Sequence, residues 1–475
     1  MAKFNNTATI KTTNKECHVA YRMKDKEKLI TQVLTSFFNE SKFYGDNSKE
    51  MIETIQRVIK TDPQFVSKLA VFARREFNMR SVAHVLTGFL AHEVEGKPYA
   101  RETIRGVSLR GDDVTEIMSF YLNTFGKPIP NSVRNGICDV LKTFDEYTLA
   151  KYKGDGKGVK MRDLLCLCRP KPKDAEQEAM WKRCLEGTLE TPLTWETELS
   201  KNGNNKKTWE GLINSGKVGY MALLRNLRNI IEAKPNNIEK VLNRIEDPVA
   251  VHKSKQLPFR FLSAYKNLPA SAGSRVYDAL ESAVEASIEN MPRLSGTTVI
   301  AVDVSGSMSG LLSSKSDIQC CEIGMLLGLI ANKMCDNSIF YTFNNNISKQ
   351  PISSRNGILH TAVHEARASG GTAMGLPFEK MLTDRVDADR IIIISDNQCN
   401  CGWSSPVQSL ADQYRRKSGN DIWVHAIDLQ GYGTQQFHGP KTNIIAGWSE
   451  KVFDFIRLAE QGEGTLEKTI SEYTW

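Results

Sequence analysis

The sequence predicts a multidomain protein in which an all-α helical repeat precedes a doubly wound α/β domain. The chain has 475 residues, more than one hydrophobic core usually organises. Apolar residues recur at helical spacing over residues 25–289, whereas short apolar runs alternate with helical stretches after Leu294-Ser295-Gly296. We therefore expect a polar N-terminal arm at residues 1–24, a helical domain at 25–294 and an α/β domain at 295–475.

The helical domain should consist of many short helices. The clearest predicted helices are Lys28–Phe38, Lys49–Ile59, Pro63–Phe77, Arg80–Glu93, Gly111–Phe125 and Asn131–Leu141. Gly, Pro or Asn separates them and no heptad pattern joins them, which favours stacked helix pairs of the HEAT kind. No fixed repeat period is found, so this interpretation depends on the helical pattern alone.

The last 180 residues alternate between strand and helix patterns. Strands are predicted at Thr297–Val302, Ser338–Phe343, Arg390–Ser395 and Ile422–Asp428, and helices at Asp317–Met334, Met374–Leu382, Pro406–Arg416 and Lys451–Glu460. Consecutive strands joined through helices must run parallel in one sheet. Ligands of such sheets bind beyond the carboxyl ends of the strands.

Oxygen-bearing side chains follow two of these strands. The first strand ends on Asp303, Ser305 and Ser307, and a third strand ends on Asp396 after Ser395. Thr372 lies in a glycine loop between them, in Ser-Gly-Gly-Thr. Carboxylate and hydroxyl oxygens suit a hard divalent cation. The plainer alternative is that residues 305–310 form only a Ser/Gly turn.

The order Asp-x-Ser-x-Ser, then Thr, then Asp resembles the metal-ion-dependent adhesion site of von Willebrand factor A domains. The resemblance implies that Asp303, Ser305, Ser307, Thr372 and Asp396 bind one cation, some through water. Mg²⁺ is the expected ion, with Mn²⁺ or Ca²⁺ as the other candidates. An open coordination position would accept a partner's carboxylate.

Charge and cysteine usage limit the classes of protein to consider. Residues 1–300 contain 47 Lys and Arg against 36 Asp and Glu, a net +11, whereas residues 301–475 contain 15 against 19, a net −4. A polyanionic partner should therefore contact the first part. The ten cysteines form no zinc-spaced set and are expected to be free thiols. No signal segment or membrane span is recognised, so we expect a cytoplasmic protein.

The helical part carries a second resemblance. Ala70-Val71-Phe72-Ala73-Arg74-Arg75-Glu76, the stretches Thr191–Thr197 and Leu257–Phe261, and above all Gly219–Asn229 resemble the TROVE module. A TROVE module followed by an A domain is the domain order of the Ro autoantigen family, and the chain resembles a bacterial or phage-type member of that family. The resemblance implies a ring of HEAT-like helices that binds Y-RNA-like structured RNA outside and single-stranded 3′ ends in a central hole. It further implies a role in RNA quality control or as a scaffold for a nuclease or another RNA-processing partner.

Two groups of basic residues are candidates for RNA contact. The first surrounds a glycine-rich stretch and comprises Lys151, Tyr152, Lys153, Lys157, Lys160, Arg162, Arg169 and Lys171. Lysines and backbone amides there could follow phosphates while Tyr152 stacks on a base. Arg225 and Arg228 form the second group, at i, i+3 on one predicted helix. A solvated loop is the alternative for the first group, and buried structural arginines for the second.

Three functions remain in competition. The favoured one is a monomeric noncoding-RNA-binding ring, with neither DNA nor membrane as a partner. The alternative is a metal-dependent protein-adhesion scaffold that uses the A-domain cation. A hydrolase is the third, but the chain has no G-x-x-x-x-G-K-[ST], H-E-x-x-H or G-x-S-x-G motif. We expect no enzymatic activity and no catalytic residues.

Overall fold

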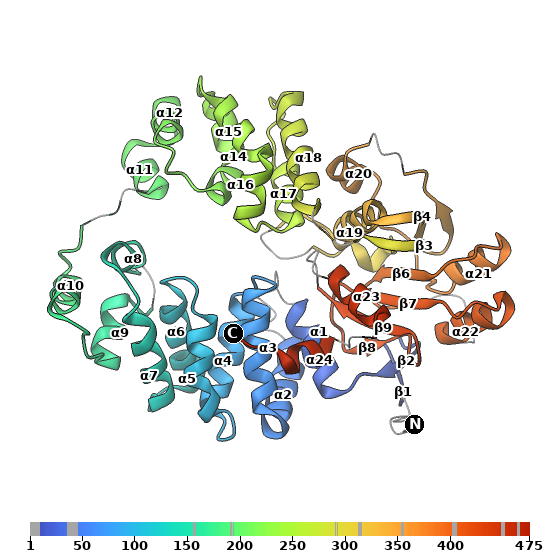
Figure 1. Ribbon diagram of the computed structural model, residues 1–475, viewed down its shortest axis with the longest axis horizontal. Helices are drawn as coiled ribbons and strands as arrows, with labels where there is room; N and C mark the ends of the chain where they lie inside the picture. Colours follow the sequence, from blue (N-terminus) through green and yellow to red (C-terminus); the bar gives the residue numbers. More distant parts are fainter. Residues whose placement is uncertain are drawn as a thin grey trace. The chain divides into compact units, whose positions relative to one another are not determined.

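The computed structural model describes twelve stretches of the chain, which contain the helices and strands of Figure 1. They are residues 10–35, 46–154, 158–190, 192, 194–289, 291, 293–311, 316–352, 356–400, 406–447, 452–462 and 466–475. Contacts divide the chain into two compact units. We call residues 25–193 with 466–475 the helical unit, and residues 1–24 with 194–465 the mixed unit. These units do not coincide with the three predicted segments, because the chain passes between them three times.

The helical unit is built from consecutive short helices. They are α1 (Asp25–Leu34), α2 (Asp46–Thr61), α3 (Pro63–Arg75), α4 (Ser81–His92), α5 (Lys97–Val107), α6 (Asp113–Phe125), α7 (Asn131–Leu141), α8 (Glu146–Lys151), α9 (Met161–Cys168), α10 (Ala175–Glu186) and α24 (Leu466–Glu472). Helix α3 shows why they begin where they do: Pro63 occupies the first turn, and the Asp62 carboxylate accepts a hydrogen bond from the Phe65 amide at 3.0 Å. Neighbours along the chain pack together, α3 on α4 and α4 on α5, as expected for stacked helix pairs.

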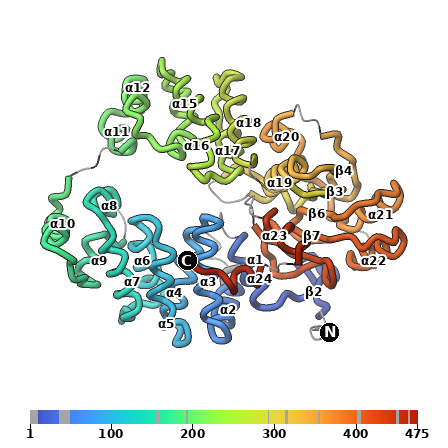
Figure 2. Tube along the Cα trace, in the orientation of Figure 1, coloured from blue at the N-terminus to red at the C-terminus, as the bar shows by residue number. Residues whose placement is uncertain are grey.

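Residues 466–475 pack within the helical unit although they follow the α/β region in sequence. Helix α24 contacts α3 and α1 (Figure 2). The Tyr473 hydroxyl bonds the Glu76 carboxylate at 2.9 Å, and its ring meets Phe72 edge to face. A Cβ atom at Gly106 would lie 2.8 Å from the Trp475 indole nitrogen. Glycine is therefore required on α5 for this close approach.

The mixed unit begins its helical part at residue 195. Its helices are α11 (Trp195–Asn202), α12 (Lys206–Asn214), α13 (Tyr220–Arg225), α14 (Leu227–Ala233), α15 (Ile238–Glu246), α16 (Pro248–Ser254), α17 (Pro258–Lys266) and α18 (Ser274–Ile288). Among the described residues, no helix of either unit is long and apolar enough to cross a lipid bilayer. The nine cysteines in the described part are free thiols, and Cys401 lies outside it.

A six-stranded sheet forms the second half of the mixed unit. Its strands are β3 (Leu294–Asp303), β4 (Cys335–Phe343), β5 (Ile347–Lys349), β6 (Arg390–Ser395), β7 (Trp423–Asp428) and β9 (Thr442–Ala446), in the order β5-β4-β3-β6-β7-β9. All pairs are parallel except β4 with β5. The four predicted strands are confirmed as β3, β4, β6 and β7. Every residue of β6 is buried, as expected for a central parallel strand.

Helices connect these strands and cover the sheet. They are α19 (Cys320–Met334), α20 (Ile358–His364), α21 (Leu376–Thr383), α22 (Val407–Ser418) and α23 (Val452–Glu460), with a short 3₁₀ turn at Gly306–Ser309. One core lies between the sheet and helices α21 and α22, where Ile391 and Ile393 of β6 join Phe378 and Tyr414. Alternate residues of each strand thus fill one face of the sheet.

Residues 1–24, which we expected to be a polar arm, contribute two strands. Strand β1 (Lys11–Thr13) pairs with β2 (Val19–Arg22), and β2 pairs antiparallel with β8 (Thr434–Gln435). The expectation of an arm is therefore wrong for residues 10–24. Strands of two to four residues hold too few positions for a readable alternation, and backbone pairing with β8 stabilises them instead.

A buried polar network lies at the amino ends of β6 and β7. Arg390 donates two hydrogen bonds to the Glu460 carboxylate, at 2.6 and 2.8 Å, and His425 contacts the same carboxylate at 3.0 Å. Burial alone would raise the pKa of Glu460, but the bonds from His425 and Arg390 outweigh it and lower that pKa to about 2. Burial lowers the pKa of His425, which favours the neutral form of its ring.

We expect this network to make the protein less stable in acid. Because the pKa of His425 is lowered on folding, the unfolded chain takes up a proton there more readily than the folded chain as the pH falls below 6.5. The stability that Glu460 contributes is present above pH 4.5 and is lost as the pH falls towards its folded pKa of about 2. Glu460→Gln should lower the free energy of unfolding at pH 7 by about 2 to 3 kcal/mol. It should also flatten the decline between pH 5 and 3, measured by denaturant titration at each pH. Glu365→Gln, at an exposed residue after α20, is the control, and equal pH dependence in both variants would contradict the assignment.

Candidate functional site

Strands β3 and β6 bring the predicted acidic residues to one edge of the sheet. The strands are adjacent and parallel, with Val302 opposite Ile394, so Asp303 and Asp396 follow neighbouring strand positions. Both side chains are buried. The Asp303 carboxylate accepts hydrogen bonds from the Ser395 hydroxyl at 2.5 Å and from the Ser305 amide at 2.8 Å. The predicted carboxylates therefore lie where the loops after β3 and β6 meet.

The predicted hydroxyl groups come from two loops that are bonded together. Ser305 and Ser307, at the 3₁₀ turn, have their hydroxyl oxygens 3.2 Å apart. The Gly306 amide donates to the Gly370 carbonyl at 2.8 Å, which holds the loop of Thr372 against this turn. Thr372 is fully buried, and no partner within the described residues bonds its hydroxyl. An oxygen buried without a partner indicates a ligand that would satisfy it.

The carboxylates of this edge lack a positive partner. No Lys or Arg within the described stretches forms an ion pair with Asp303 or Asp396, and Asp396 Oδ2 has no hydrogen-bond partner there. Burial, together with the charge of Asp396, raises the pKa of Asp303 to about 7, and burial also raises the pKa of Asp396. A divalent cation would remove this cost and take up the orphaned oxygens of Asp396 and Thr372.

The donor set limits how a cation could be held. In the described part of the chain, no group of three or more His, Cys, Asp or Glu side chains is placed to bind a metal. A cation at this edge would therefore use two carboxylates, the hydroxyls of Ser305, Ser307 and Thr372, and water. An all-oxygen set of this kind fits Mg²⁺, Mn²⁺ or Ca²⁺ and excludes a structural zinc site.

A third buried acid at the same edge was missed in the sequence. Asp428 ends β7, opposite Ser395 of β6. Its Oδ1 accepts hydrogen bonds from the amides of Gln430 and Gly431, both at 2.9 Å, while Oδ2 has no partner in the described part. Burial raises its pKa to about 6. The predicted strand Ile422–Asp428 already ended on this residue. An acid at the carboxyl end of a predicted parallel strand was therefore the signal that could have identified Asp428 as a site residue.

The first basic group surrounds the loop between α8 and α9, within the helical unit. Lys151, Lys153 and Arg162 are exposed and Lys160 is half-buried. Lys153, Lys160 and Arg162 line a pocket of about 180 Å³, together with Cys184 and Glu190. The structure thus brings these cations to one place, which we call the basic loop. Lys157 lies outside the described residues.

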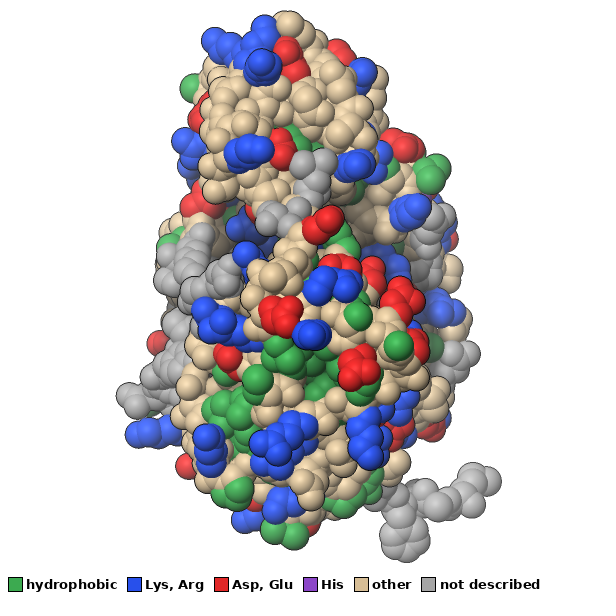
Figure 3. Space-filling view, turned by 90° about the vertical axis from the view of Figure 1, so that its left-hand side faces the viewer, with side chains coloured by type: hydrophobic (Ala, Val, Ile, Leu, Met, Phe, Trp, Pro, Cys, Tyr) green, Lys and Arg blue, Asp and Glu red, His purple; other side chains and the backbone are tan. Residues whose placement is uncertain are grey.

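Two further residues of this group lie past the other end of α9. Arg169 caps the helix in the left-handed conformation, with φ of 50°, and Lys171 follows it. Both are exposed. Figure 3 shows the face of the molecule that carries α8 to α10, where lysine and arginine side chains lie in separate groups among acidic and hydrophobic ones. A polyanion bound to this face would therefore contact separate small groups of basic residues rather than one continuous basic surface.

Tyr152 is less available for stacking than we expected. Its ring is half-buried, and a Cβ atom at Gly111 would lie 2.5 Å from it. The guanidinium of Arg110 and the ammonium of Lys151 lie 5.6 and 5.5 Å from the ring centroid. The ring therefore positions two cations at the loop, and a base would compete with them for its face.

The second basic group does not share one helix. The chain breaks at Asn226, so Arg225 ends α13 and Arg228 lies in α14, and the predicted continuous helix is wrong. Asn226 is buried, and its amide group bonds the Ala222 carbonyl at 2.9 Å. Both arginines are exposed rather than buried between helices. Arg228 pairs with Glu232 at 3.0 Å, whereas the charge of Arg225 contributes to a lowered pKa of Arg260 after the larger effect of burial.

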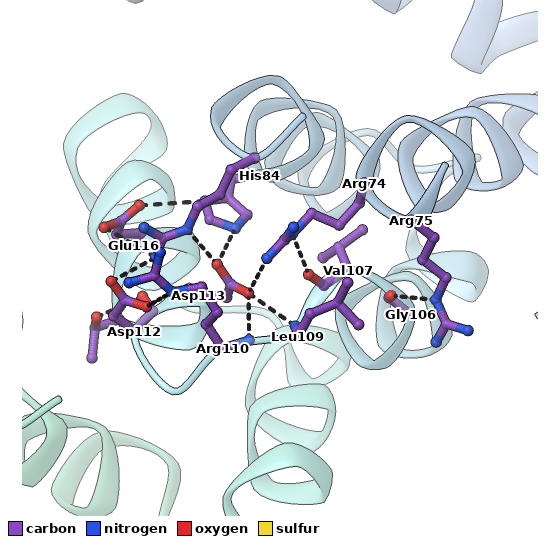
Figure 4. Close-up of polar contacts among 12 residues, drawn as sticks. Arg74, Arg75, His84, Gly106, Val107, Leu109, Arg110, Asp112, Asp113 and Glu116 are labelled. Atoms are coloured by element: carbon purple, nitrogen blue, oxygen red, sulfur yellow. Dashed lines mark hydrogen bonds and ion pairs between the residues drawn. The ribbon is translucent and has the colours of Figure 1, made fainter. Parts of the chain in front are cut away.

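Other arginines of the helical unit are structural. Asp113, which is fully buried, accepts hydrogen bonds from Arg74 at 3.1 Å and from the amides of Leu109 and Arg110, and Arg80 and His84 bind its other oxygen (Figure 4). Burial opposes the charged form, but the contact with His84 and the charges of Arg74 and Arg80 hold the pKa of Asp113 well below its usual range. Three helices, α3, α4 and α6, are joined at this carboxylate. Arg74 and Arg80 are therefore structural residues that pair with Asp113.

Comparison with known families assigns both parts of the chain. The TROVE domain matches residues 11–190 and 187–272, more than half of the chain, and the Ro60 vWA domain matches residues 297–456. The TROVE match thus includes the β1–β2 segment that precedes the first helix.

Individual relatives are distant. Telomerase protein component 1 of Rattus norvegicus is 25% identical over 335 residues, which is 52% of this chain and 13% of that protein. RNA-binding protein RO60 of Deinococcus radiodurans is 25% identical over 339 residues, 60% of this chain and 63% of the relative. The chain thus spans less than two thirds of these relatives. The crystal structure of the Deinococcus radiodurans RO (RSR) protein matches with a TM-score of 0.62 at 18% identity, covering 93% of this chain and all of the other, which supports the fold.

We expect the edge of β3 and β6 to bind a divalent cation. Calorimetry with Mn²⁺ or Mg²⁺ should detect one site, and Asp303→Ala should weaken it by more than about a hundredfold because half of the charged ligands are removed. Thr372→Ala should cost less, about tenfold, since a water can replace a hydroxyl. Asp421→Ala, at an exposed acid before β7, is the control. Unchanged binding by a folded Asp303→Ala protein, checked by circular dichroism, would exclude this site.

Proposed function

The chain belongs to the TROVE-domain family, joined here to a Ro60-type von Willebrand A domain, and on that basis we propose that it binds noncoding RNA. Relatives in Deinococcus radiodurans and Caenorhabditis elegans carry the name RNA-binding protein RO60. The observation that carries the proposal for this chain is the basic loop, in which Lys153, Lys160 and Arg162 line one pocket and exposed Lys151 ends the preceding helix α8.

The basic loop has the chemistry to hold a phosphate backbone. Its exposed ammonium and guanidinium groups release counterions when they neutralise phosphates, which favours binding without sequence preference. Asp163 accepts a hydrogen bond from the Lys160 amide at 2.8 Å and so caps α9, while Glu190 lines the pocket beside the cations. Structured RNA of the Y-RNA type is the proposed ligand, because its rigid phosphate path suits cations fixed by helix ends.

A second RNA contact is proposed for single-stranded 3′ ends. The exposed side chain of Arg225 is the candidate, and Arg228, although paired with Glu232, is exposed enough to exchange that partner for a phosphate. If the helices close into a ring, as the family resemblance implies, a hole of single-strand width would select RNA by its free end. Selection of this kind suits RNA quality control.

The cation edge is proposed to serve protein contact in the same particle. A hard cation held by Asp303, Asp396 and three hydroxyls, with water in its remaining positions, can accept an acidic side chain from a nuclease or another RNA-processing partner. A role as an adhesion scaffold without RNA is the weaker candidate, since it leaves the basic loop unexplained. A non-enzymatic, cytoplasmic monomer remains our expectation.

Reversing the charge of the basic loop should weaken RNA binding and its salt dependence. The variant Lys151→Glu, Lys153→Glu, Lys160→Glu, Arg162→Glu should flatten log Kd against log salt by roughly 0.7 to 0.9 for each phosphate that is no longer neutralised. Filter binding with a structured RNA at several salt concentrations gives both quantities. The control carries the same charge change at exposed Lys60, Lys97, Arg105 and Lys127. Equal RNA affinity and equal slopes of log Kd against log salt in the two variants would show that the basic loop is only a solvated surface without a role in RNA binding.

Arg225 should distinguish tailed from blunt RNA. Of two hairpins with the same stem, the one with a single-stranded 3′ overhang should bind more tightly, because its end can reach a contact that excludes a duplex. Arg225→Glu should remove most of that difference while the blunt hairpin retains its affinity. Arg244→Glu, at an exposed arginine of α15, is the matched control. Equal binding of both hairpins to the unaltered protein would rule out end selection and leave the basic loop unaffected.

A further inference from the structure

The pocket beside the basic loop is lined by two kinds of surface. Lys153, Lys160 and Arg162 bring positive charge to it from the loop between α8 and α9 and from the first turn of α9. Its other lining residues come from the end of α8 and from the stretch that closes α10: Ala150, Cys184, Gly187, Leu189, Glu190 and Pro192. The Met161 amide donates to the Lys153 carbonyl at 3.1 Å, which joins the two sides of the loop. All of these residues belong to the helical unit.

One wall of the pocket is apolar. Ala150 and Cys184 are buried, and Leu189 and Pro192 are half-buried. Burial raises the pKa of the Cys184 thiol to about 11, so this thiol is uncharged at neutral pH and packs as a small apolar group. The volume of about 180 Å³ is smaller than the roughly 300 to 1,000 Å³ of pockets that hold drug-sized ligands or cofactors. The pocket therefore suits one small ring system rather than a complete nucleotide.

Gly187 turns the chain back towards the pocket. It ends α10 in the left-handed conformation, with φ of 73°, which glycine adopts without strain. The Thr188 amide donates to the Arg183 carbonyl at 2.9 Å and completes the cap. A Cβ atom at Gly187 would meet no heavy atom within 4 Å, so the turn borders open space. Leu189 and Glu190 follow the turn and line the pocket.

Glu190 distinguishes this pocket from a simple phosphate site. Its carboxylate would repel a phosphate placed among the three cations. No ion pair within the described stretches includes Glu190, and Arg183 of α10 already donates two hydrogen bonds to Glu146, at 3.1 and 2.6 Å. An ionised carboxylate only accepts hydrogen bonds, so a ligand that suits this position must bring N–H or O–H donors.

We propose that the pocket takes one unpaired guanine of a bound RNA, with the base against the apolar wall and its Watson–Crick edge on Glu190. Guanine offers two adjacent N–H donors on that edge, at N1 and N2, and a carboxylate can accept both. Adenine, cytosine and uracil each place an acceptor beside their donor, where it would face the second carboxylate oxygen. The flanking phosphates would lie on Lys153, Lys160 and Arg162. This inference rests on the proposed RNA binding by the basic loop.

The pocket would give the basic loop a preference that its cations alone do not have. Contacts to phosphates position an RNA without reading its sequence, whereas an unstacked base can be read through hydrogen bonds to its edge. Guanines within a perfect stem are paired and cannot enter the pocket. The ligand class is therefore structured RNA that carries a bulged or looped guanine beside a helix.

Blunt hairpins with one bulged nucleotide test this proposal. A bulged guanine should bind about tenfold more tightly than a bulged adenine, cytosine or uracil in the same stem, because two matched hydrogen bonds discriminate between bases by about that factor. Inosine, which lacks the N2 amino group, should lose most of the advantage. Filter binding at one salt concentration gives these ratios, with a hairpin without a bulge as the reference. Equal affinity for all four bulged hairpins would overturn the proposal.

Glu190→Gln separates base recognition from general electrostatics. Removing a negative charge beside the cations should strengthen the binding of every hairpin alike. The ratio of guanine to adenine affinity should also fall from about ten to about one, because a glutamine side chain has only one acceptor oxygen. Glu186→Gln, which removes the same charge from the last turn of α10, should leave that ratio unchanged. Glu190→Ala is the second variant, and an unchanged ratio in both Glu190 variants, folded by circular dichroism, contradicts the proposal.

Two further outcomes identify other failures. Free 5′-GMP brings only one phosphate to the cations and should bind far more weakly than the bulged-guanine hairpin in calorimetry; comparable affinity would overturn the RNA ligand in favour of a free nucleotide. If the unaltered protein binds none of the hairpins, the proposed RNA function itself fails. Binding of all hairpins without a preference for guanine would leave that function standing and remove only the role of the pocket.

Discussion

The main constraint on the sheet edge of this protein is a pair of buried carboxylates that have no positive partner among the residues the structure describes. Parallel pairing of β3 with β6 puts Asp303 and Asp396 at neighbouring strand ends, where burial removes their hydration. Hydrogen bonds bring the surrounding loops to this point: the Gly306 amide donates to the Gly370 carbonyl, the Asn14 side chain donates to the Cys399 carbonyl, and the Lys15 amide donates to the Gln398 side chain. Burying two carboxylates at this edge is electrostatically unfavourable, and a bound cation would offset that cost.

Asp113 shows how the same chain treats a buried carboxylate that is purely structural. Arg74, Arg80 and His84 surround it, and its pKa stays well below the usual range, whereas the pKa of Asp303 is raised to about 7. The helical unit therefore supplies two arginines to its buried acid, whereas no Lys or Arg of the described residues pairs with Asp303 or Asp396. The contrast separates a buried acid that holds the fold together, Asp113, from the buried acids for which we propose a cation, Asp303 and Asp396.

The sequence predicted the elements whose pattern is local. The apolar run of β6 and the periodic helices α3, α4, α6 and α7 are long enough to be recognised, and the Asp-x-Ser-x-Ser order marks a strand end. Features that depend on distant partners were missed. The short strands β1, β2 and β8 stabilise one another only through pairing, and the role of Arg74 depends on Asp113, which lies 39 residues away. The break at Asn226 was hidden because apolar residues continue on both sides of it.

Residues 466–475 complete the packing of α3 and α5, yet they are translated long after them. Between residue 193 and residue 466 the ribosome adds 272 residues, which takes roughly 14 to 54 seconds at about 5 to 20 residues per second. Throughout that interval the surface around Phe72, Glu76 and Gly106 lacks its cover of Tyr473 and Trp475. Final maturation of the helical unit is consequently delayed until synthesis of the α/β region is over, and a nascent chain stalled within that region would present this apolar surface to chaperones.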